Sequence, residues 1–257
     1  MSKKILVAAH KAYDVPKSKI YLPIQVGAFC KDGIGFIRDD EGDNISSLNA
    51  NFCELTGAYW AWKNLDADYI GLVHYRRYFA GKERFNVNGK TKKILSEREL
   101  DALLKKTDVI LPKKRHYYIE SLYSHYAHTL YVEPLDETGA IIKEFYPKYY
   151  AEFERFKTRR SAHIFNMFVM KREIFCGYCE WLFDILFKLK DRVDLSEYSA
   201  FHARLFGRIS ELLLDVYINV NGIKFKEVKP VYIEGVNWFQ KGVKFLKAKF
   251  KNRKYEK

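Results

Sequence analysis

The segment Tyr69–Phe79 joins a hydrophobic run to a group of side chains that bind anions. Its first part is short and apolar, which is typical of a buried strand, and it continues into His74, Tyr75, Arg76 and Arg77. Ligands of open α/β sheets bind at the carboxyl ends of strands, and paired guanidinium groups suit phosphate. The segment therefore predicts an anion-binding site, although an ion-pair cluster on the surface would have the same composition.

The two arginines also offer a way to stabilise a leaving diphosphate without a metal ion. A nucleoside diphosphate gains negative charge as its bond to a sugar breaks, and fixed cations stabilise that charge. Arg76 and Arg77 are adjacent in the sequence, so strand alternation predicts that only one of them faces the ligand. The acidic pair Asp66 and Asp68 has the spacing of a metal-binding D-x-D, but it precedes the strand. We interpret it as a helix-to-strand turn, and no metal site is predicted.

The flanking sequence alternates strands with helices, which predicts an α/β fold with a mixed central sheet. Further strands are expected at Lys4–Ala9, Asp108–Pro112, Ala162–Lys171 and Lys224–Ile233, with Ile24–Phe29 as an additional apolar element. Helices are expected at Phe52–Leu65, with Asn51 as N-cap and Glu54 completing a capping box, and at Glu97–Lys106, Glu173–Lys190 and Ile209–Val220. Lys82–Lys93 is expected to be an exposed loop, and residues 113–158 an insertion of short helices over the sheet edge.

The composition fits one large globular domain or two small ones, with 257 residues of which 48% are hydrophobic and 16% aromatic. No stretch reaches the ~18 apolar residues of a membrane span, and the apolar run near the N-terminus is too short for a signal peptide. These features predict a cytoplasmic protein with reduced cysteines. Cys176 and Cys179 form a C-x-x-C inside a helical pattern, which favours buried thiols over a zinc site. Phosphate-loop, dinucleotide-binding, nucleophile-elbow and H-E-x-x-H motifs are absent from the sequence.

The net charge of +13 is concentrated in the last residues of the chain. Residues 236–257 carry eight Lys or Arg and one acid, interleaved with Trp238, Phe239 and Phe245. This pattern predicts a segment that associates with an anionic membrane surface at the inner face of the plasma membrane. A solvated terminus and a nucleic-acid-binding segment are the alternatives. The predicted organisation is therefore a domain at residues 1–235 and a basic tail at residues 236–257.

Five blocks of the sequence resemble a bacterial family found in capsule and exopolysaccharide gene clusters. The blocks are Gly42–Ser46, Cys53–Asn64, Gly71–Phe79, Asn166–Phe168 and Gly207–Glu211. The family was long described as a domain of unknown function and is grouped with glycosyltransferases of GT-A type. The resemblance implies a GT-A-like, Rossmann-type domain and a nucleotide-sugar donor, with UDP-galactofuranose as the leading candidate. It also implies a saccharide or polyprenyl-linked acceptor in the synthesis of capsule, exopolysaccharide or O-antigen.

The resemblance and the residue chemistry together assign roles to individual side chains. For an inverting, metal-independent transfer without a cofactor, Glu211 is the expected general base, Asp215 the fallback, and Arg76 and Arg77 the groups that stabilise the leaving diphosphate. Donor contacts are expected from His10, Lys11, Asp43, Asn44, Thr56, Tyr59, Lys63, His74, Tyr75 and Arg208. Acceptor contacts are expected from His163, Asn166 and His128.

Several of these assignments have a structural alternative. The pair Asp43–Asn44 also fits simple turn chemistry. Glu211 also fits a charge that complements a helix N-terminus. For the whole protein, the same residues fit a non-catalytic module that binds polysaccharide or lipid phosphate, or a basic nucleic-acid-binding protein.

Overall fold

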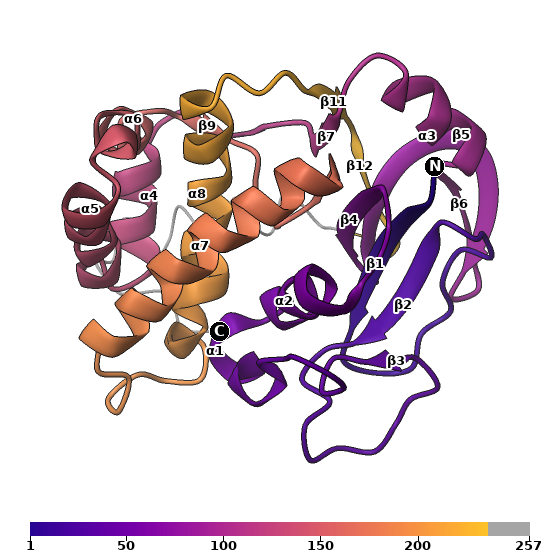
Figure 1. Cartoon of the computed structure of the whole chain (residues 1–257), viewed down its shortest axis with the longest axis horizontal. Coiled ribbons are helices and arrows are strands. Elements are labelled where there is room, and N and C mark those ends of the chain that lie inside the picture. The colour runs from indigo at the N-terminus through magenta and orange to yellow at the C-terminus, as the bar shows by residue number, and fades with distance from the viewer. Residues whose placement is uncertain (236–257) are drawn as a thin grey trace.

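The computed structural model describes residues 1–235. In this part of the chain ten strands form one sheet, whose main path runs β11-β7-β10-β4-β1-β2-β3 and whose branch through β5 adds β6 and β12 (Figure 1). The strands are β1 (Lys3–Ala9), β2 (Tyr21–Gln25), β3 (Ile37–Arg38), β4 (Tyr69–His74), β5 (Arg77–Val87), β6 (Lys90–Ile94), β7 (Val109–Pro112), β10 (Phe168–Lys171), β11 (Lys226–Val228) and β12 (Pro230–Tyr232). A separate pair is formed by β8 (Arg115–His116) and β9 (Ser161–Ala162).

Parallel and antiparallel pairs occur in the same sheet, so the predicted mixed α/β fold is confirmed. Strand β1 pairs in parallel with both β2 and β4, whereas β10 runs antiparallel to β4 and β7. Because β1 and β4 are parallel neighbours, their carboxyl ends meet at one edge of the sheet. The residues that follow those ends, His10 after β1 and Tyr75 after β4, are therefore brought together.

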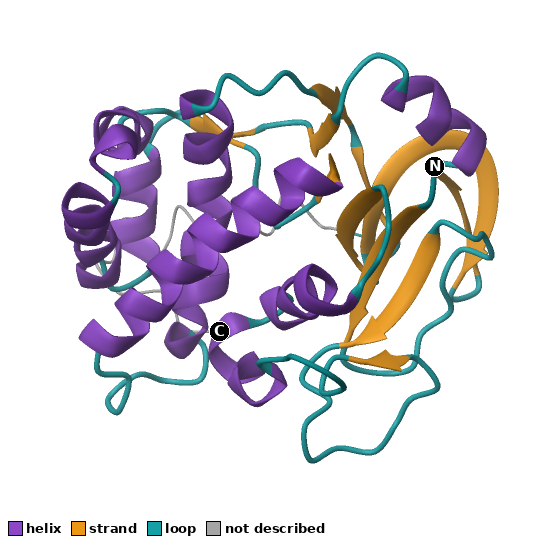
Figure 2. Cartoon of the chain, in the orientation of Figure 1, coloured by secondary structure: helices purple, strands orange, loops and turns teal. Residues whose placement is uncertain are grey.

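Most helices lie beside the sheet rather than evenly around it (Figure 2). The described helices are α1 (Asn49–Phe52), α2 (Leu55–Asn64), α3 (Glu97–Leu104), α4 (Leu122–Thr129), α5 (Glu133–Phe145), α6 (Pro147–Lys157), α7 (Arg172–Arg192) and α8 (Leu205–Val220), with the 3-10 turns η1 (Ser46–Leu48) and η2 (His202–Arg204). None of the helices in residues 1–235 combines the length and apolar character needed to cross a bilayer.

The side chains of β1 alternate between two cores, which explains why this strand is apolar throughout. Leu6 and Ala8 pack in the core that contains α2, α7 and α8. Ile5 and Val7 pack in the core on the other face, with residues of β5, β6 and α3. A sheet covered on both faces favours continuous hydrophobic strands. The central strands could therefore be predicted from their apolar runs in the sequence.

The predicted insertion of short helices is present, but its position differs from the expectation. Helices α4, α5 and α6 occupy most of residues 113–158. Helix α6 packs against α8, and α5 against α7. The insertion therefore builds a helical layer beside the sheet (Figure 1) instead of lying over the sheet edge.

The predicted helix at Phe52–Leu65 is in fact two helices that meet at a sharp turn. Cys53 has a φ of 54° between α1 and α2, which interrupts the helical hydrogen bonds. Asn51 does not act as the N-cap, because its side-chain amide donates to the carbonyl oxygen of Ala203 at 3.0 Å. Glu54 occupies the cap position of α2 but makes no side-chain capping bond.

Further boundaries differ from the sequence prediction, and the strand expected at Lys224–Ile233 is two strands, β11 paired with β7 and β12 paired with β5. Lys82–Lys93 is a β-hairpin of β5 and β6, because Asn88 and Gly89 with φ of 49° and 70° form a tight turn. The strand expected at Ala162–Lys171 is divided into β9 and β10 by a turn. Helix α8 begins at Leu205 instead of Ile209. The predicted basic tail, residues 236–257, lies outside the described residues.

Candidate active site

The predicted anion-binding segment lies at the carboxyl ends of β1 and β4. The imidazole rings of His10 and His74 both pack against the ring of Tyr75, with centroid distances of 5.4 and 4.4 Å. The ammonium group of Lys11 lies 5.8 Å from the centroid of the same ring. The end of β1 and the end of β4 are thus joined by a buried tyrosine that supports basic groups from both strands.

The two adjacent arginines have different environments. The Arg76 side chain is 44% exposed, lies 3.8 Å from the carboxylate of Glu234 and sits over the Tyr75 ring at 5.1 Å. The Arg77 side chain lies over the ring of Phe165, with 4.1 Å from Cζ to the ring centroid. Burial lowers the pKa of the Arg77 guanidinium, which nevertheless stays charged at neutral pH. Arg77 is therefore the more desolvated of the two cations.

The histidines of this cluster are neutral at physiological pH. Burial, together with electrostatic repulsion from Arg77 and Arg76, lowers the pKa of His74 to about 3. Burial also lowers the pKa of His10, together with repulsion from Arg76 and Lys11. Neutral imidazoles supply hydrogen bonds rather than charge, so the arginines and Lys11 provide the positive field.

Two arginines from the start of α8 extend the cluster. Arg204 ends the 3-10 turn η2 and directly precedes α8, and Arg208, four residues later in the sequence, lies in the first turn of α8. The Arg204 Nε donates to the Sγ of Cys53 at 3.1 Å, and its charge lowers the pKa of His74 across the site. The Arg208 guanidinium lies 4.0 Å from the Phe201 ring centroid, and its buried Nη1 has no hydrogen-bond partner among residues 1–235. The sequence prediction included Arg208 but missed Arg204, whose only signal was this spacing.

Glu211 lies among these cations and has an unusual pKa. Burial is the main effect that raises the pKa of its carboxyl, and repulsion from Glu54 raises it as well. The charge of Arg77 and the nearby backbone N–H of Phe165 act in the opposite direction, and the resulting pKa is about 7. A carboxyl group of this pKa is suited to general-base catalysis near neutral pH. Glu211 lies in the second turn of α8 rather than at a helix opening, so the helix-terminus alternative does not explain it.

The arginines around Glu211 are not neutralised by ion pairs. No carboxylate oxygen of residues 1–235 lies within 4.0 Å of the side-chain nitrogens of Arg77, Arg115, Arg204 or Arg208. By contrast, Arg38, Arg155 and Arg192 on the surface have close carboxylate partners. The site therefore has an excess of positive charge that suits a multiply charged anion.

The residues predicted to bind the acceptor make hydrogen bonds or ion pairs within the protein. His163 is fully buried, and its ring nitrogens contact Asp215 Oδ1 and Glu227 Oε1, the latter at 2.9 Å. Asp215 is 2% exposed and also accepts from the backbone N–H of His163 at 3.0 Å, so it does not face the site as a fallback base would. Asn166 is buried as well, whereas His128 on α4 is 48% exposed and its Nδ1 lies 2.8 Å from Oε1 of Glu120, which precedes the helix.

Several predicted donor contacts are also structural. Thr56 is fully buried, with its hydroxyl donating to the carbonyl oxygen of Cys53 at 3.1 Å. Lys63 lies 3.6 Å from a ring centroid of Trp62, near the opposite end of α2 from Glu54. Tyr59 donates to Asp43 Oδ1 at 3.3 Å. Each of the three thus has a contact within the protein, and Thr56 is bonded to Cys53, the residue that Arg204 also contacts.

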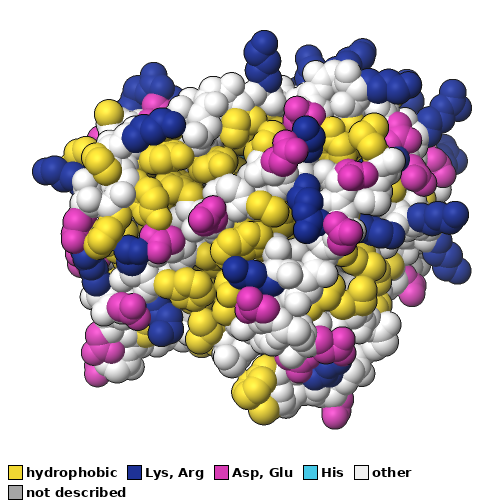
Figure 3. Space-filling model, viewed as in Figure 1, with side chains coloured by type: hydrophobic (Ala, Val, Ile, Leu, Met, Phe, Trp, Pro, Cys, Tyr) yellow, Lys and Arg dark blue, Asp and Glu magenta, His cyan; other side chains and the backbone are white. Residues whose placement is uncertain are grey.

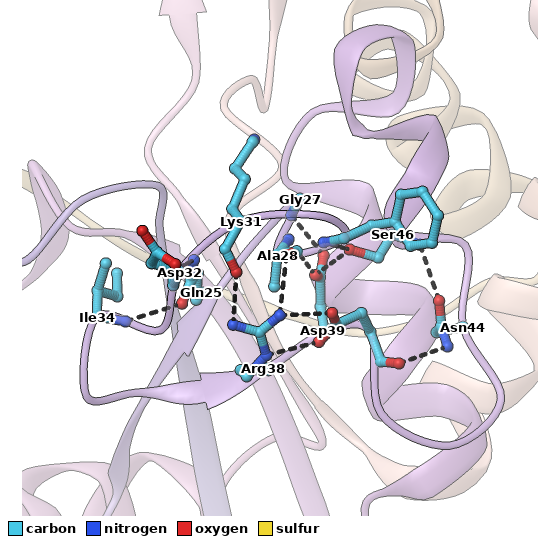
Figure 4. Close-up of polar contacts among 12 residues, drawn as sticks. Gln25, Gly27, Ala28, Lys31, Asp32, Ile34, Arg38, Asp39, Asn44 and Ser46 are labelled. Carbon is cyan, nitrogen blue, oxygen red and sulfur yellow. Dashed lines mark hydrogen bonds and ion pairs between the residues drawn. The ribbon is translucent and has the colours of Figure 1, made fainter.

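The loop after β2 is organised by its own hydrogen bonds, as Figure 4 shows. The buried carboxylate of Asp39 accepts from the backbone N–H groups of Gly27 and Ala28 at 2.8 and 2.9 Å. The Asn44 side chain donates to the carbonyl oxygens of Asp40 and Gly42 and accepts from the backbone N–H of Ser46. The turn interpretation of Asp43–Asn44 therefore accounts for Asn44.

The D-x-D segment lies in a helix-to-strand turn, as the sequence predicts, and the C-x-x-C segment lies in α7. Asp66 and Asp68 lie in the turn between α2 and β4, where Asp66 pairs with Arg172 at 2.8 Å. Cys179 is buried in α7 and Cys176 is partly buried. Within residues 1–235 no group of three or more His, Cys, Asp or Glu side chains is arranged to hold a metal ion.

The fold and the site define an α/β protein with a mixed sheet and a cationic site, containing a carboxyl of raised pKa, at the ends of its parallel strands. The chain belongs to the family described as a domain of unknown function, DUF4422, whose profile matches residues 4–222. It is similar to a solved apo structure of WbbM, a bifunctional glycosyltransferase, with 31% sequence identity and a TM-score of 0.82. The match covers 91% of this chain and 46% of that chain. None of the curated proteins matches the sequence significantly.

Proposed function

We propose that the protein is a glycosyltransferase that moves a hexose from a nucleoside-diphosphate sugar to a hydroxyl group of an acceptor. The observation that carries the proposal is the position of Glu211, a carboxyl with a pKa of about 7, among Arg77, Arg204 and Arg208, which have no carboxylate partner within residues 1–235. A leaving diphosphate requires that positive field, and an attacking hydroxyl requires that base. The similarity to WbbM supports the same reaction class.

The reaction is proposed to be a single displacement that inverts the anomeric centre. The acceptor oxygen forms a bond to the anomeric carbon while the bond from that carbon to the diphosphate oxygen breaks. Glu211 takes the proton of the acceptor hydroxyl, and the bonding electron pair leaves with the diphosphate. Arg77 and Arg204 stabilise the negative charge that develops there. No metal ion takes part in this proposed mechanism.

The finer identity of the substrates is also proposed. UDP-galactofuranose is the leading donor, and a saccharide or polyprenyl-linked chain is the acceptor, in the synthesis of capsule, exopolysaccharide or O-antigen. The family resemblance supports this choice. The basic tail at residues 236–257 is proposed to hold the enzyme at the inner face of the plasma membrane, which its charge and aromatic content support.

A panel of nucleotide sugars tests the proposal directly. The full chain is incubated with UDP-, GDP- and dTDP-hexoses, UDP-galactofuranose among them, and with a short saccharide acceptor, and free nucleoside diphosphate is measured. Release that depends on both acceptor and Glu211 is expected for one or a few donors. Saturable binding of saccharide without release from any donor would favour a binding module instead.

A further inference from the structure

A strained turn lies between β9 and β10, next to the proposed base. Phe165 and Asn166 are consecutive and have φ of 85° and 48°, both in the left-handed region that favours glycine. Residues other than glycine keep such conformations only where surrounding contacts hold them. Two in succession therefore indicate that the turn is fixed by its neighbours, and such strain is common at functional sites.

The contacts that fix the turn come from the side chain of Asn166. Its Nδ2 donates to Glu54 Oε1 at 3.0 Å and to the Gly207 carbonyl oxygen at 2.9 Å. Its Oδ1 accepts from the Ser210 hydroxyl at 2.9 Å. Both amide hydrogens and the amide oxygen are thus used, in a side chain that is 2% exposed. One amide joins the turn to the start of α2 and to the first turns of α8.

Phe165, which precedes Asn166, connects the turn to the proposed reacting groups. The backbone N–H of Phe165 lies close to the carboxyl of Glu211 and lowers its pKa. The ring of Phe165 supports the guanidinium of Arg77 at 4.1 Å. The turn therefore contacts both the proposed base and the more desolvated arginine of the site.

We infer that Asn166 is a positioning residue for the proposed reaction, on which this inference rests: its side-chain amide fixes the turn that holds Phe165 against Glu211. The carboxylate of Glu54 accepts one of the hydrogen bonds that hold this amide in place. Glu54 has a second effect, because its negative charge opposes ionisation of Glu211 and raises the pKa of that carboxyl. The network thus sets both the position and the proton affinity of the base without touching the substrate.

The variant Asn166→Gly removes the side-chain amide and still allows the same backbone conformation, since glycine adopts the left-handed region freely. Loss of the amide should loosen the Phe165 N–H from Glu211 and so raise the pKa of that carboxyl above about 7. Glu54→Gln should lower the pKa of Glu211, because the substitution removes the neighbouring negative charge. The matched control is Asn88→Gly in the β5–β6 hairpin, where φ is also left-handed at 49°, and it should leave the titration unchanged.

The titration is followed by NMR on the full chain labelled with carboxyl-13C glutamate, and the Glu211 signal is assigned by its loss in Glu211→Gln. Turnover of the best donor in the panel is measured in parallel. Asn166→Gly should lower kcat by ~10-fold to 100-fold, as misplaced catalytic groups do, with little change in the KM for the donor.

A folded Asn166→Gly protein with an unchanged Glu211 titration and an unchanged kcat would overturn the inference. If Asn166→Gly does not fold, Ser210→Ala removes one bond to the amide and should give a smaller shift in the same direction. No shift in Ser210→Ala would then overturn it. The NMR titration needs no donor, so it still decides the role of Asn166 towards Glu211 if the panel refutes the proposed function.

Discussion

Replacing Arg76 and Arg77 by alanine, one at a time, should give two different phenotypes although the residues are adjacent. Arg76 is 44% exposed and its partner Glu234 is 46% exposed, at 3.8 Å. An exposed ion pair of this kind contributes ~0–1 kcal/mol to stability. Arg77 has no carboxylate partner in residues 1–235, is desolvated, and lies over Phe165.

The magnitude for Arg77 follows from its proposed role. Removing a fixed donor that stabilises developing negative charge costs ~100-fold to 1,000-fold in kcat, or ~3–4 kcal/mol in the barrier. Arg77→Ala should also raise the pKa of Glu211, because the charge of Arg77 lowers it. The acidic limb of the pH–rate profile should therefore move to higher pH. Arg76→Ala should leave the profile in place and change kcat by less than ~5-fold, which corresponds to less than ~1 kcal/mol in the activation barrier.

The assay is steady-state release of nucleoside diphosphate from the donor identified in the panel, between pH 5 and pH 9. Arg84→Ala serves as the control, since Arg84 is an exposed arginine on β5. Thermal denaturation of all three variants separates loss of fold from loss of rate. Equal rates for Arg76→Ala and Arg77→Ala, with profiles that superimpose on the wild type, would refute the assignment of the diphosphate to Arg77.

The remaining predictions concern the base, the metal ion, the tail and the histidine. Glu211→Gln should keep nucleotide affinity, measured by calorimetry with UDP, and lose ~100-fold to 10,000-fold in transfer; wild-type transfer would place the base elsewhere. Activity should survive EDTA, and loss that manganese or magnesium restores would reveal a metal requirement. Deleting residues 236–257 should abolish salt-sensitive co-sedimentation with anionic vesicles, and equal pelleting would exclude the tail as the anchor. The pKa of His74 is about 3 in the folded protein, whereas the ordinary value, expected for the unfolded chain, is 6.5. The unfolded state therefore binds the proton at a higher pH, and the free energy of unfolding falls as the pH drops below about 6.5. Urea titrations should show the wild type losing ~3 kcal/mol more than His74→Gln between pH 7 and pH 4, whereas equal losses would show that His74 is not the responsible group.

The central strands and the long helices could be predicted because their signals are local. Strands β1, β4 and β7 are short apolar runs that lie between two cores, and α7 has a clear helical period. The breaks could not be predicted, because tertiary contacts impose them. Cys53 adopts a φ of 54° where α1 and α8 come close: a Cβ on Gly207 would lie 3.2 Å from the Sγ of Cys53. The local sequence Phe52–Leu55 contains no signal that predicts this contact.

The hairpin at β5 and β6 was missed for a different reason. Its outward face is charged, so Lys82–Lys93 has the composition of a loop, while Phe85 and Val87 on the inward face are buried. Figure 3 shows many Lys and Arg side chains at this end of the molecule, around β5, β6 and α3. The Asn88–Gly89 pair was the available signal, since this dipeptide is typical of two-residue hairpin turns.

The sequence does not show which of the predicted site residues make their hydrogen bonds inside the protein. His163, Asn166 and Thr56 are polar and lie in or beside the family blocks, yet each is buried with its hydrogen bonds made inside the protein. A buried polar group must find such partners, because leaving it unsatisfied costs ~1–3 kcal/mol. The buried Nη1 of Arg208, by contrast, has no hydrogen-bond partner among residues 1–235. The folded arrangement is needed to tell which polar residues make their hydrogen bonds within the scaffold, and Arg77, Arg204, Arg208 and Glu211 are the groups that we propose act on a substrate.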